Sequence, residues 1–144
     1  MATFTTGDGV DLHYTDDGDG PPVLLLAGFC GPAESWEFQR RALIDAGHRV
    51  IALDRRSHGR SADPPLRALL RDHAAQDWRD VVARLSVPSL FLAPRDSQLW
   101  PAGHAAWAAS VNERAGVVTL DGCGHAMAVD QPEAVSAAIV EFLR

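Results

Sequence analysis

Two loops in the C-terminal half of the chain carry side chains suited to hydrolytic chemistry. The first, residues 94–97 (PRDS), contains Asp96, and the second, residues 122–125 (GCGH), ends on His125. An imidazole can take a proton from an attacking group, and a carboxylate beside it can orient the ring and stabilise its charged form. The two loops therefore predict a general base at His125 and a supporting carboxylate at Asp96.

The attacking atom is not given by a standard motif, because no stretch of the chain reads G-x-S-x-G. Residues 28–31 (GFCG) imitate such a turn, with Cys30 between an apolar run and a helix opened by Pro32. A helix N-terminus and a nearby imidazole both favour the thiolate, and the backbone amides there can hold an oxyanion. We predict Cys30 as nucleophile, with Gly28, Phe29 and Trp100 as the oxyanion and substrate-binding residues.

Two alternatives to Cys30 remain open. Ser57 places a hydroxyl beside His58 in a loop that follows an apolar strand. Alternatively, His125 activates a water molecule directly, and no side chain attacks.

The N-terminal half reads as a hairpin followed by a β-α-β unit. Residues 4–6 and 10–14 flank Asp8-Gly9, a pair typical of a two-residue antiparallel turn. Residues 23–27 are apolar on both faces, which is typical of a parallel strand covered by helices. A helix is predicted from Pro32 to Ala46 and ends at Gly47, and residues 49–54 follow as a second parallel strand.

The C-terminal half continues the alternation. We expect helices over residues 66–86 and 101–115, strands over 87–93 and 117–120, and a last helix with Asp130 as cap and Glu133 in a capping box. The predicted fold class is α/β: a mostly parallel sheet flanked by helices, with an N-terminal antiparallel hairpin. The length and 47% hydrophobic content predict a single domain over residues 1–144.

Charge and composition argue against several classes of binding partner. The formal net charge of −6 gives no basic stripe for nucleic acid, and the longest apolar run, residues 23–29, is too short to span a membrane. No metal-ligand spacing such as H-E-x-x-H occurs, so we expect neither a metal nor a cofactor. Two cysteines do not make a disulfide framework. With no signal-peptide pattern at the N-terminus, a cytoplasmic location is expected.

Residues 26–31 (LAGFCG), Trp36 and residues 49–61 (RVIALDRRSHGRS) resemble the H-G-F-x-G … W … R-V-I-A-x-D-x-R-G-H-G-x-S segment of α/β-hydrolases, closest to the haloperoxidase, esterase and lactonase branch. Residues 87–97, Gly124-His125 and 131–133 (QPE) are similar to that family's closing segment. The chain departs from the pattern between about residues 65 and 85, where the elbow strand, its serine and the cap are missing. Ala27 and Ser57 also replace the family's usual histidine and glycine.

The resemblance implies a shortened α/β-hydrolase domain that acts on small activated esters or lactones, with a small-molecule substrate as its partner. Without the elbow strand, we expect the strands at residues 23 and 90 to become neighbours, which would bring Cys30 beside Asp96 and His125. The alternative function is a catalytically degenerate module for small-molecule binding or assembly. Exposed Phe29, Leu99, Trp100 and Met127 would favour a homodimer or larger oligomer.

Overall fold

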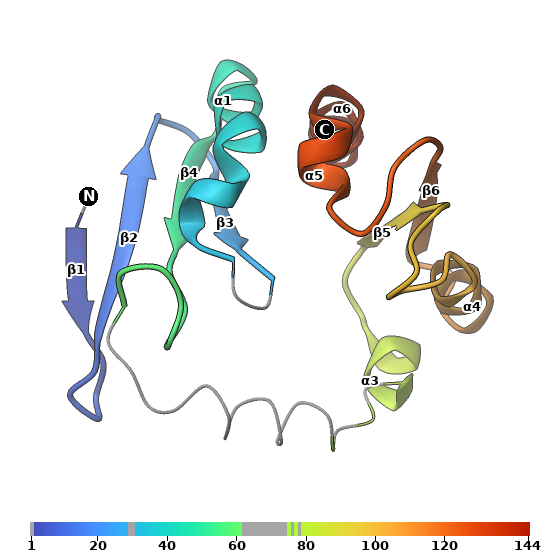
Figure 1. Ribbon diagram of the computed structural model, residues 1–144, viewed down its shortest axis with the longest axis horizontal. Coiled ribbons are helices and arrows are strands. Elements are labelled where there is room, and N and C mark those ends of the chain that lie inside the picture. Colours follow the sequence, from blue (N-terminus) through green and yellow to red (C-terminus); the bar gives the residue numbers. More distant parts are fainter. Residues whose placement is uncertain (1, 29–30, 62–74, 76, 78) are drawn as a thin grey trace. The chain divides into compact units, whose positions relative to one another are not determined.

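The strands and helices of the N-terminal half follow the predicted order. A computed structural model describes residues 2–28, 31–61, 75, 77 and 79–144 (Figure 1). The described residues fall into two compact units, the N-terminal unit Met1–Ala75 and the C-terminal unit Gln76–Arg144, and each is described by itself. The prediction of one domain over residues 1–144 stays a prediction.

The N-terminal unit holds a four-stranded mixed sheet. Its strands are β1 (Ala2–Thr5), β2 (Asp11–Asp17), β3 (Pro22–Leu26) and β4 (Arg49–Leu53), in the order β1-β2-β4-β3. The β1-β2 and β2-β4 pairs are antiparallel, whereas β3 and β4 are parallel. The predicted hairpin and the parallel β-α-β unit are therefore confirmed, because a 3-10 turn (η1, Ala33–Trp36) and helix α1 (Glu37–Asp45) connect β3 to β4.

The hairpin turn differs from the predicted two-residue loop. Thr6 and Val10 remain paired, because the Thr6 amide donates to the Val10 carbonyl over 2.9 Å, so the loop holds three residues. The Gly9 amide donates to the Thr6 carbonyl over 2.9 Å, and Gly9 has a φ of 84°. A three-residue loop that ends on a left-handed glycine also fits the right-handed twist of the strands. The pair Asp8-Gly9 is therefore compatible with a two-residue loop and with a three-residue loop.

The core of the N-terminal unit lies between α1 and one face of the sheet. Leu43 on α1 is 1% exposed, and Val50 and Ala52 on β4 are 0% and 1% exposed. On β3, Leu25 is buried but Leu24 and Leu26 are 56% and 47% exposed. The prediction that residues 23–27 are covered on both faces is therefore wrong for these two leucines, since the described part of this unit contributes a helix to one face only.

The C-terminal unit pairs β5 (Ser89–Pro94) with β6 (Ala115–Leu120) as a parallel two-stranded sheet. Helix α3 (Arg79–Arg84) precedes β5, α4 (Gly103–Val111) connects the strands, and α5 (Met127–Asp130) and α6 (Pro132–Phe142) follow β6. Residues 62–74, in the region of the helix predicted over 66–86, lie outside the described residues. Since β3 and β5 belong to different units, their predicted pairing also stays a prediction.

The predicted cap of the last helix is wrong. Gln131 occupies the cap position of α6 without a side-chain cap bond, and Pro132 begins the helix. Asp130 instead closes the short helix α5, and its carboxylate accepts a hydrogen bond from the Gly124 amide over 3.2 Å. The carboxylate that the sequence assigns to the helix therefore holds the loop that carries His125.

Candidate active site

The two loops with the predicted acid and base leave the same end of the C-terminal unit's sheet. In the parallel register, Pro94 at the end of β5 faces Leu120 at the end of β6. Beyond the strands, the Arg95 amide donates to the Leu120 carbonyl over 2.9 Å, and the Asp96 amide donates to the Cys123 carbonyl over 3.3 Å. Carboxyl ends of parallel strands are where open α/β sheets bind ligands. The structure thus brings the Asp96 and His125 loops together.

Cys123 anchors the histidine loop in the core of this unit. Its side chain is 3% exposed and packs in a cluster with Leu120 and Val135, and its thiol donates to the Leu120 carbonyl over 3.6 Å. Burial raises the pKa of the Cys123 thiol, and Asp130 and Asp96 raise it further by disfavouring a second negative charge. Cys123 is therefore a neutral, free thiol that fixes the loop two residues before His125.

His125 and Asp96 are both exposed, and no side-chain hydrogen bond joins them in the part of the chain that the structure describes. Catalytic hydrogen bonds in unliganded enzymes are often long and tighten only when substrate binds. The loops are close, but the orientation of the imidazole is not fixed by the carboxylate.

Ser57 belongs to the N-terminal unit, in the loop after β4. Its φ of 62° is the only left-handed backbone conformation among the described non-glycine residues. The loop is held by Asp54, which is 3% exposed and whose carboxylate accepts from the Ala33 amide over 2.6 Å and the Arg60 amide over 2.9 Å. Ser61 also holds it, since its hydroxyl donates to the Asp54 carbonyl over 2.6 Å.

The histidine beside Ser57, His58, is buried and its ring is held by neighbouring residues. His58 is 2% exposed, its Nδ1 lies 2.7 Å from the Arg56 carbonyl, and its Nε2 lies 3.3 Å from an Arg55 nitrogen. Both ring nitrogens have protein partners, so His58 is poorly placed to act as a base for Ser57.

Cys30 and Phe29 lie outside the described residues. Gly28 is described and exposed, and its carbonyl accepts from the Gly31 amide over 3.1 Å, which fits a tight turn at this point. The roles of Cys30, Phe29 and Gly28 stay predictions.

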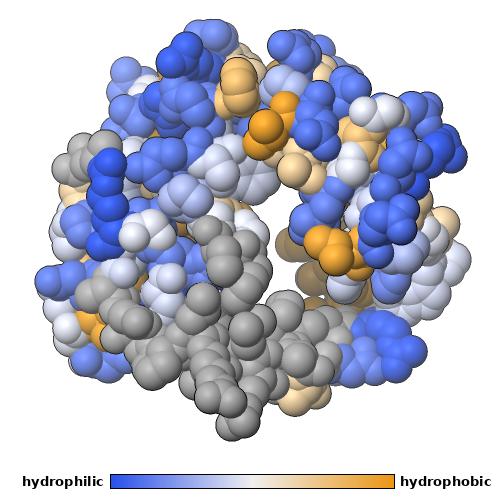
Figure 2. Space-filling view, viewed as in Figure 1, coloured by the Kyte–Doolittle hydropathy of each residue, from blue (hydrophilic) through white to orange (hydrophobic). Residues whose placement is uncertain are grey.

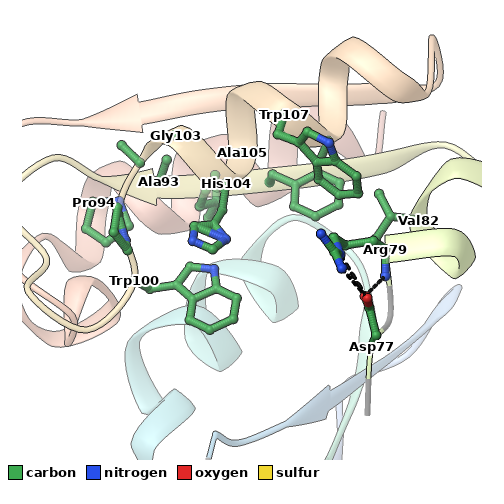
Figure 3. Close-up of a pocket in the computed structure, with 15 residues that line it drawn as sticks. Asp77, Arg79, Val82, Ala93, Pro94, Trp100, Gly103, His104, Ala105 and Trp107 are labelled. Carbon is green, nitrogen blue, oxygen red and sulfur yellow. Dashed lines mark hydrogen bonds and ion pairs between the residues drawn. The ribbon is translucent and has the colours of Figure 1, made fainter.

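A set of aromatic and charged side chains lies together in the C-terminal unit, and of these only Trp100 was predicted from the sequence as a site residue (Figure 3). Its role in substrate binding stays a prediction. Trp100 and His104 stack with ring centroids 4.7 Å apart, and Trp107 lies one helical turn beyond His104 on α4. Asp77 and Arg79 form an ion pair in the same wall. The three-residue spacing of His104 and Trp107 on a helix is the one sequence signal that could have indicated a shared face.

Comparisons with known proteins agree with the topology. The profile of the alpha/beta hydrolase family matches residues 23–87. A non-heme chloroperoxidase of Kitasatospora aureofaciens is 38% identical over 92 residues, 64% of this chain and 33% of the relative. An epoxide hydrolase of Caballeronia sordidicola is 36% identical over 105 residues, 72% of this chain and 31% of the relative. The chain belongs to the α/β-hydrolase superfamily.

Solved structures support the same α/β-hydrolase fold. An esterase from Exiguobacterium antarcticum matches with a TM-score of 0.86 at 14% identity, covering 98% of each chain. A bromoperoxidase from Bacillus anthracis matches with a TM-score of 0.82 at 15% identity, covering 94% of this chain and 96% of that chain. By sequence, this α/β-hydrolase chain spans about a third of the length of the curated relatives it matches.

Two further properties of this α/β-hydrolase chain concern the described residues alone. Among them, no helix is long and apolar enough to cross a membrane. The same residues bring no three His, Cys, Asp or Glu side chains together in a group that could hold a metal ion.

Proposed function

We propose that this protein hydrolyses short activated carboxylic esters or lactones, with His125 as general base and Asp96 as the carboxylate that supports it. The observation that carries the proposal is the pair of backbone hydrogen bonds that ties the loop of Asp96 to the loop of His125. An epoxide hydrolase among the sequence relatives and an esterase among the similar folds support a hydrolytic reaction.

In the proposed reaction, His125 takes the proton of the attacking group as that group bonds to the carbonyl carbon. Asp96 stabilises the imidazolium that forms, and backbone amides at residues 28–30 hold the oxyanion. The bond to the leaving alcohol then breaks, and His125 returns the proton to that oxygen. Where a side chain attacks, water releases the acyl group in a second cycle of the same steps.

Three attackers remain within the proposal: Cys30, Ser57 and water. Ser57 gains support from its left-handed backbone, because a nucleophile on a sharp, strained turn is held exposed above a sheet and strain is concentrated at functional sites. Cys30 gains support from its position between β3 and η1, where the local sequence most resembles an elbow. Water needs only the C-terminal unit's own residues.

A second candidate function is small-molecule binding without catalysis. The observation that favours it is the absence of a hydrogen bond between Asp96 and His125 in the described residues. Under this alternative, the chain keeps the loops of the family but not a working base.

Turnover of 4-nitrophenyl acetate and of a small lactone, followed spectroscopically or by pH-stat, separates the candidates. The hydrolase proposal predicts turnover that falls by several orders of magnitude in His125→Ala. His13→Ala is the control, since His13 lies on β2 of the N-terminal unit and takes no part in the proposed reaction. Equal rates for the native chain and His125→Ala, in preparations purified side by side, would contradict a hydrolase that uses this base.

A further inference from the structure

A cavity of about 690 Å³ lies in the C-terminal unit, between α3, β5 and α4 (Figure 3). Its wall is formed by aromatic side chains, small residues of β5 and α4, and one ion pair; the residues that matter here are Phe91, Trp100, His104, Trp107, Asp77 and Arg79. The volume falls within the range of small-molecule sites, which are mostly apolar with a few polar groups. Trp100 is also predicted to bind the substrate of the hydrolase, whereas the other residues of this wall take no part in the proposed hydrolytic step.

The aromatic wall is held in place by local structure. The Trp100 amide donates to the Ser97 hydroxyl over 3.0 Å, and Ser97 is itself 8% exposed. Pro101 follows and fixes the backbone angle at which the chain enters α4. The Trp100 and His104 rings lie at 31° to each other. A flat ligand can therefore stack on a surface that is already ordered, which reduces the entropic cost of binding.

Asp77 and Arg79 form an ion pair in the wall, and their opposite charges cancel. The Arg79 Nε donates to the two Asp77 carboxylate oxygens over 2.9 and 3.0 Å, and a second guanidinium nitrogen, Nη2, also contacts Asp77. Hydrogen bonds from Arg79 lower the pKa of Asp77 to about 2, so the pair stays ionised at neutral pH. In the described residues the Arg79 Nη1 has no protein acceptor, so it remains a donor for a ligand.

We propose that this cavity binds an uncharged, planar aromatic molecule with a carbonyl oxygen that accepts from Arg79. The aromatic walls favour a flat ring. A carboxylate would meet the negative charge of Asp77 as well as the guanidinium, whereas a neutral carbonyl gains the hydrogen bond without that repulsion. The proposal is independent of catalysis at His125.

The probe is 2-acetylnaphthalene, titrated into the full chain to about 1 mM, near the affinity expected for a ligand of this size. Binding is followed through the indole N–H signals in a ¹H–¹⁵N correlation spectrum, assigned with Trp→Phe variants. We expect the signals of Trp100 and Trp107 to shift in a saturable way. Trp36, in the N-terminal unit, is an internal control that should not shift. The proposal would be overturned if Trp36, Trp100 and Trp107 all shifted with one midpoint. It would also be overturned if neither the Trp100 signal nor the Trp107 signal shifted.

Substitutions test the aromatic wall. Trp100→Ala should weaken binding of 2-acetylnaphthalene at least about fivefold. Because Trp100 is 60% exposed, its removal should leave the unit folded. Val129→Ala is the control, since Val129 of the same unit is 58% exposed, close to the 60% of Trp100, but is not part of the cavity wall. Equal weakening by both variants would contradict a stacking role for Trp100.

A comparison of an uncharged ligand with a negatively charged one tests the proposed ligand class. The same measurements separate ligand binding from ester hydrolysis. The native chain should bind 2-acetylnaphthalene more tightly than 2-naphthoate, and Asp77→Asn should reverse that order by releasing Arg79. A native preference for 2-naphthoate would overturn the assignment of an uncharged ligand. His125→Ala should leave both affinities unchanged, so loss of esterase activity and loss of binding are distinguishable outcomes.

Discussion

The backbone amide of Asp96 donates a hydrogen bond to the carbonyl oxygen of Cys123 over 3.3 Å. This bond joins the loop after β5 to the loop after β6, because its acceptor, Cys123, lies two residues before His125 in the chain. Since Cys123 is buried among Leu120 and Val135, the core of the C-terminal unit holds both loops. The two residues proposed for catalysis therefore depend on a cysteine that takes no part in the chemistry.

The two cysteines should differ in reactivity. Burial raises the pKa of Cys123, so little thiolate forms near pH 8 and alkylation there should be slow. If Cys30 is the nucleophile, iodoacetamide should give a single adduct at Cys30 together with loss of activity. Peptide mass spectrometry after a timed reaction distinguishes the sites. Modification of Cys123 at the faster rate would contradict its assignment as a buried anchor.

Cys30→Ala should abolish activity and any burst of product if the thiol attacks, while Ser57→Ala should then be silent. Stopped-flow measurement of nitrophenol release gives both readings. A dead Ser57→Ala beside a fully active Cys30→Ala would reverse the assignment. Full activity in both variants would leave water as the attacking group.

The variants Ser57→Gly and Ser57→Ala together test whether Ser57 has a left-handed backbone conformation. A left-handed residue costs about 1–2 kcal/mol, and glycine removes that cost but loses about 0.5–1 kcal/mol through its more flexible unfolded state. Ser57→Gly should therefore be more stable than Ser57→Ala by up to about 1.5 kcal/mol. Urea unfolding, followed by signals of the N-terminal unit, measures this difference. A less stable glycine variant would mean that Ser57 does not have the left-handed conformation.

Assembly is a separate expectation. Leu99 and Trp100 are 71% and 60% exposed, which supports part of the predicted apolar patch. Met127 does not belong to it, because its side chain packs against the cluster of Leu120, Cys123 and Val135.

The visible face in Figure 2 is mainly hydrophilic, with small separated hydrophobic areas. We predict a homodimer by light scattering at micromolar concentration, reduced to monomer by Leu99→Arg. A monomeric native chain would contradict it.

Local signals in the sequence predicted the fold well. Gly47 ends α1 with a φ of 88°, and Gly9 supplies the left-handed residue of the hairpin. Both conclusions need only the few residues around each turn. The class of sheet followed in the same way, from apolar runs separated by turn residues.

The partners of individual side chains and loops could not be predicted in this way. Asp130 has the sequence context of a helix cap, yet its carboxylate accepts from the Gly124 amide, six residues earlier in the chain. Trp100 was predicted to bind substrate, but its contact with the His104 ring depends on how the chain enters α4. The same holds for Asp96 and Cys123, whose contact requires the pairing of β5 with β6.

The central claim is that Asp96 and His125 act as one catalytic unit, and a double-mutant cycle on ester hydrolysis tests it most directly. The rates of Asp96→Asn, His125→Ala and the double variant are compared with the native rate on 4-nitrophenyl acetate. Residues that act together give non-additive losses, so the double variant should be no slower than His125→Ala alone. Losses that multiply in the double variant, or no loss in either single variant, would contradict the account.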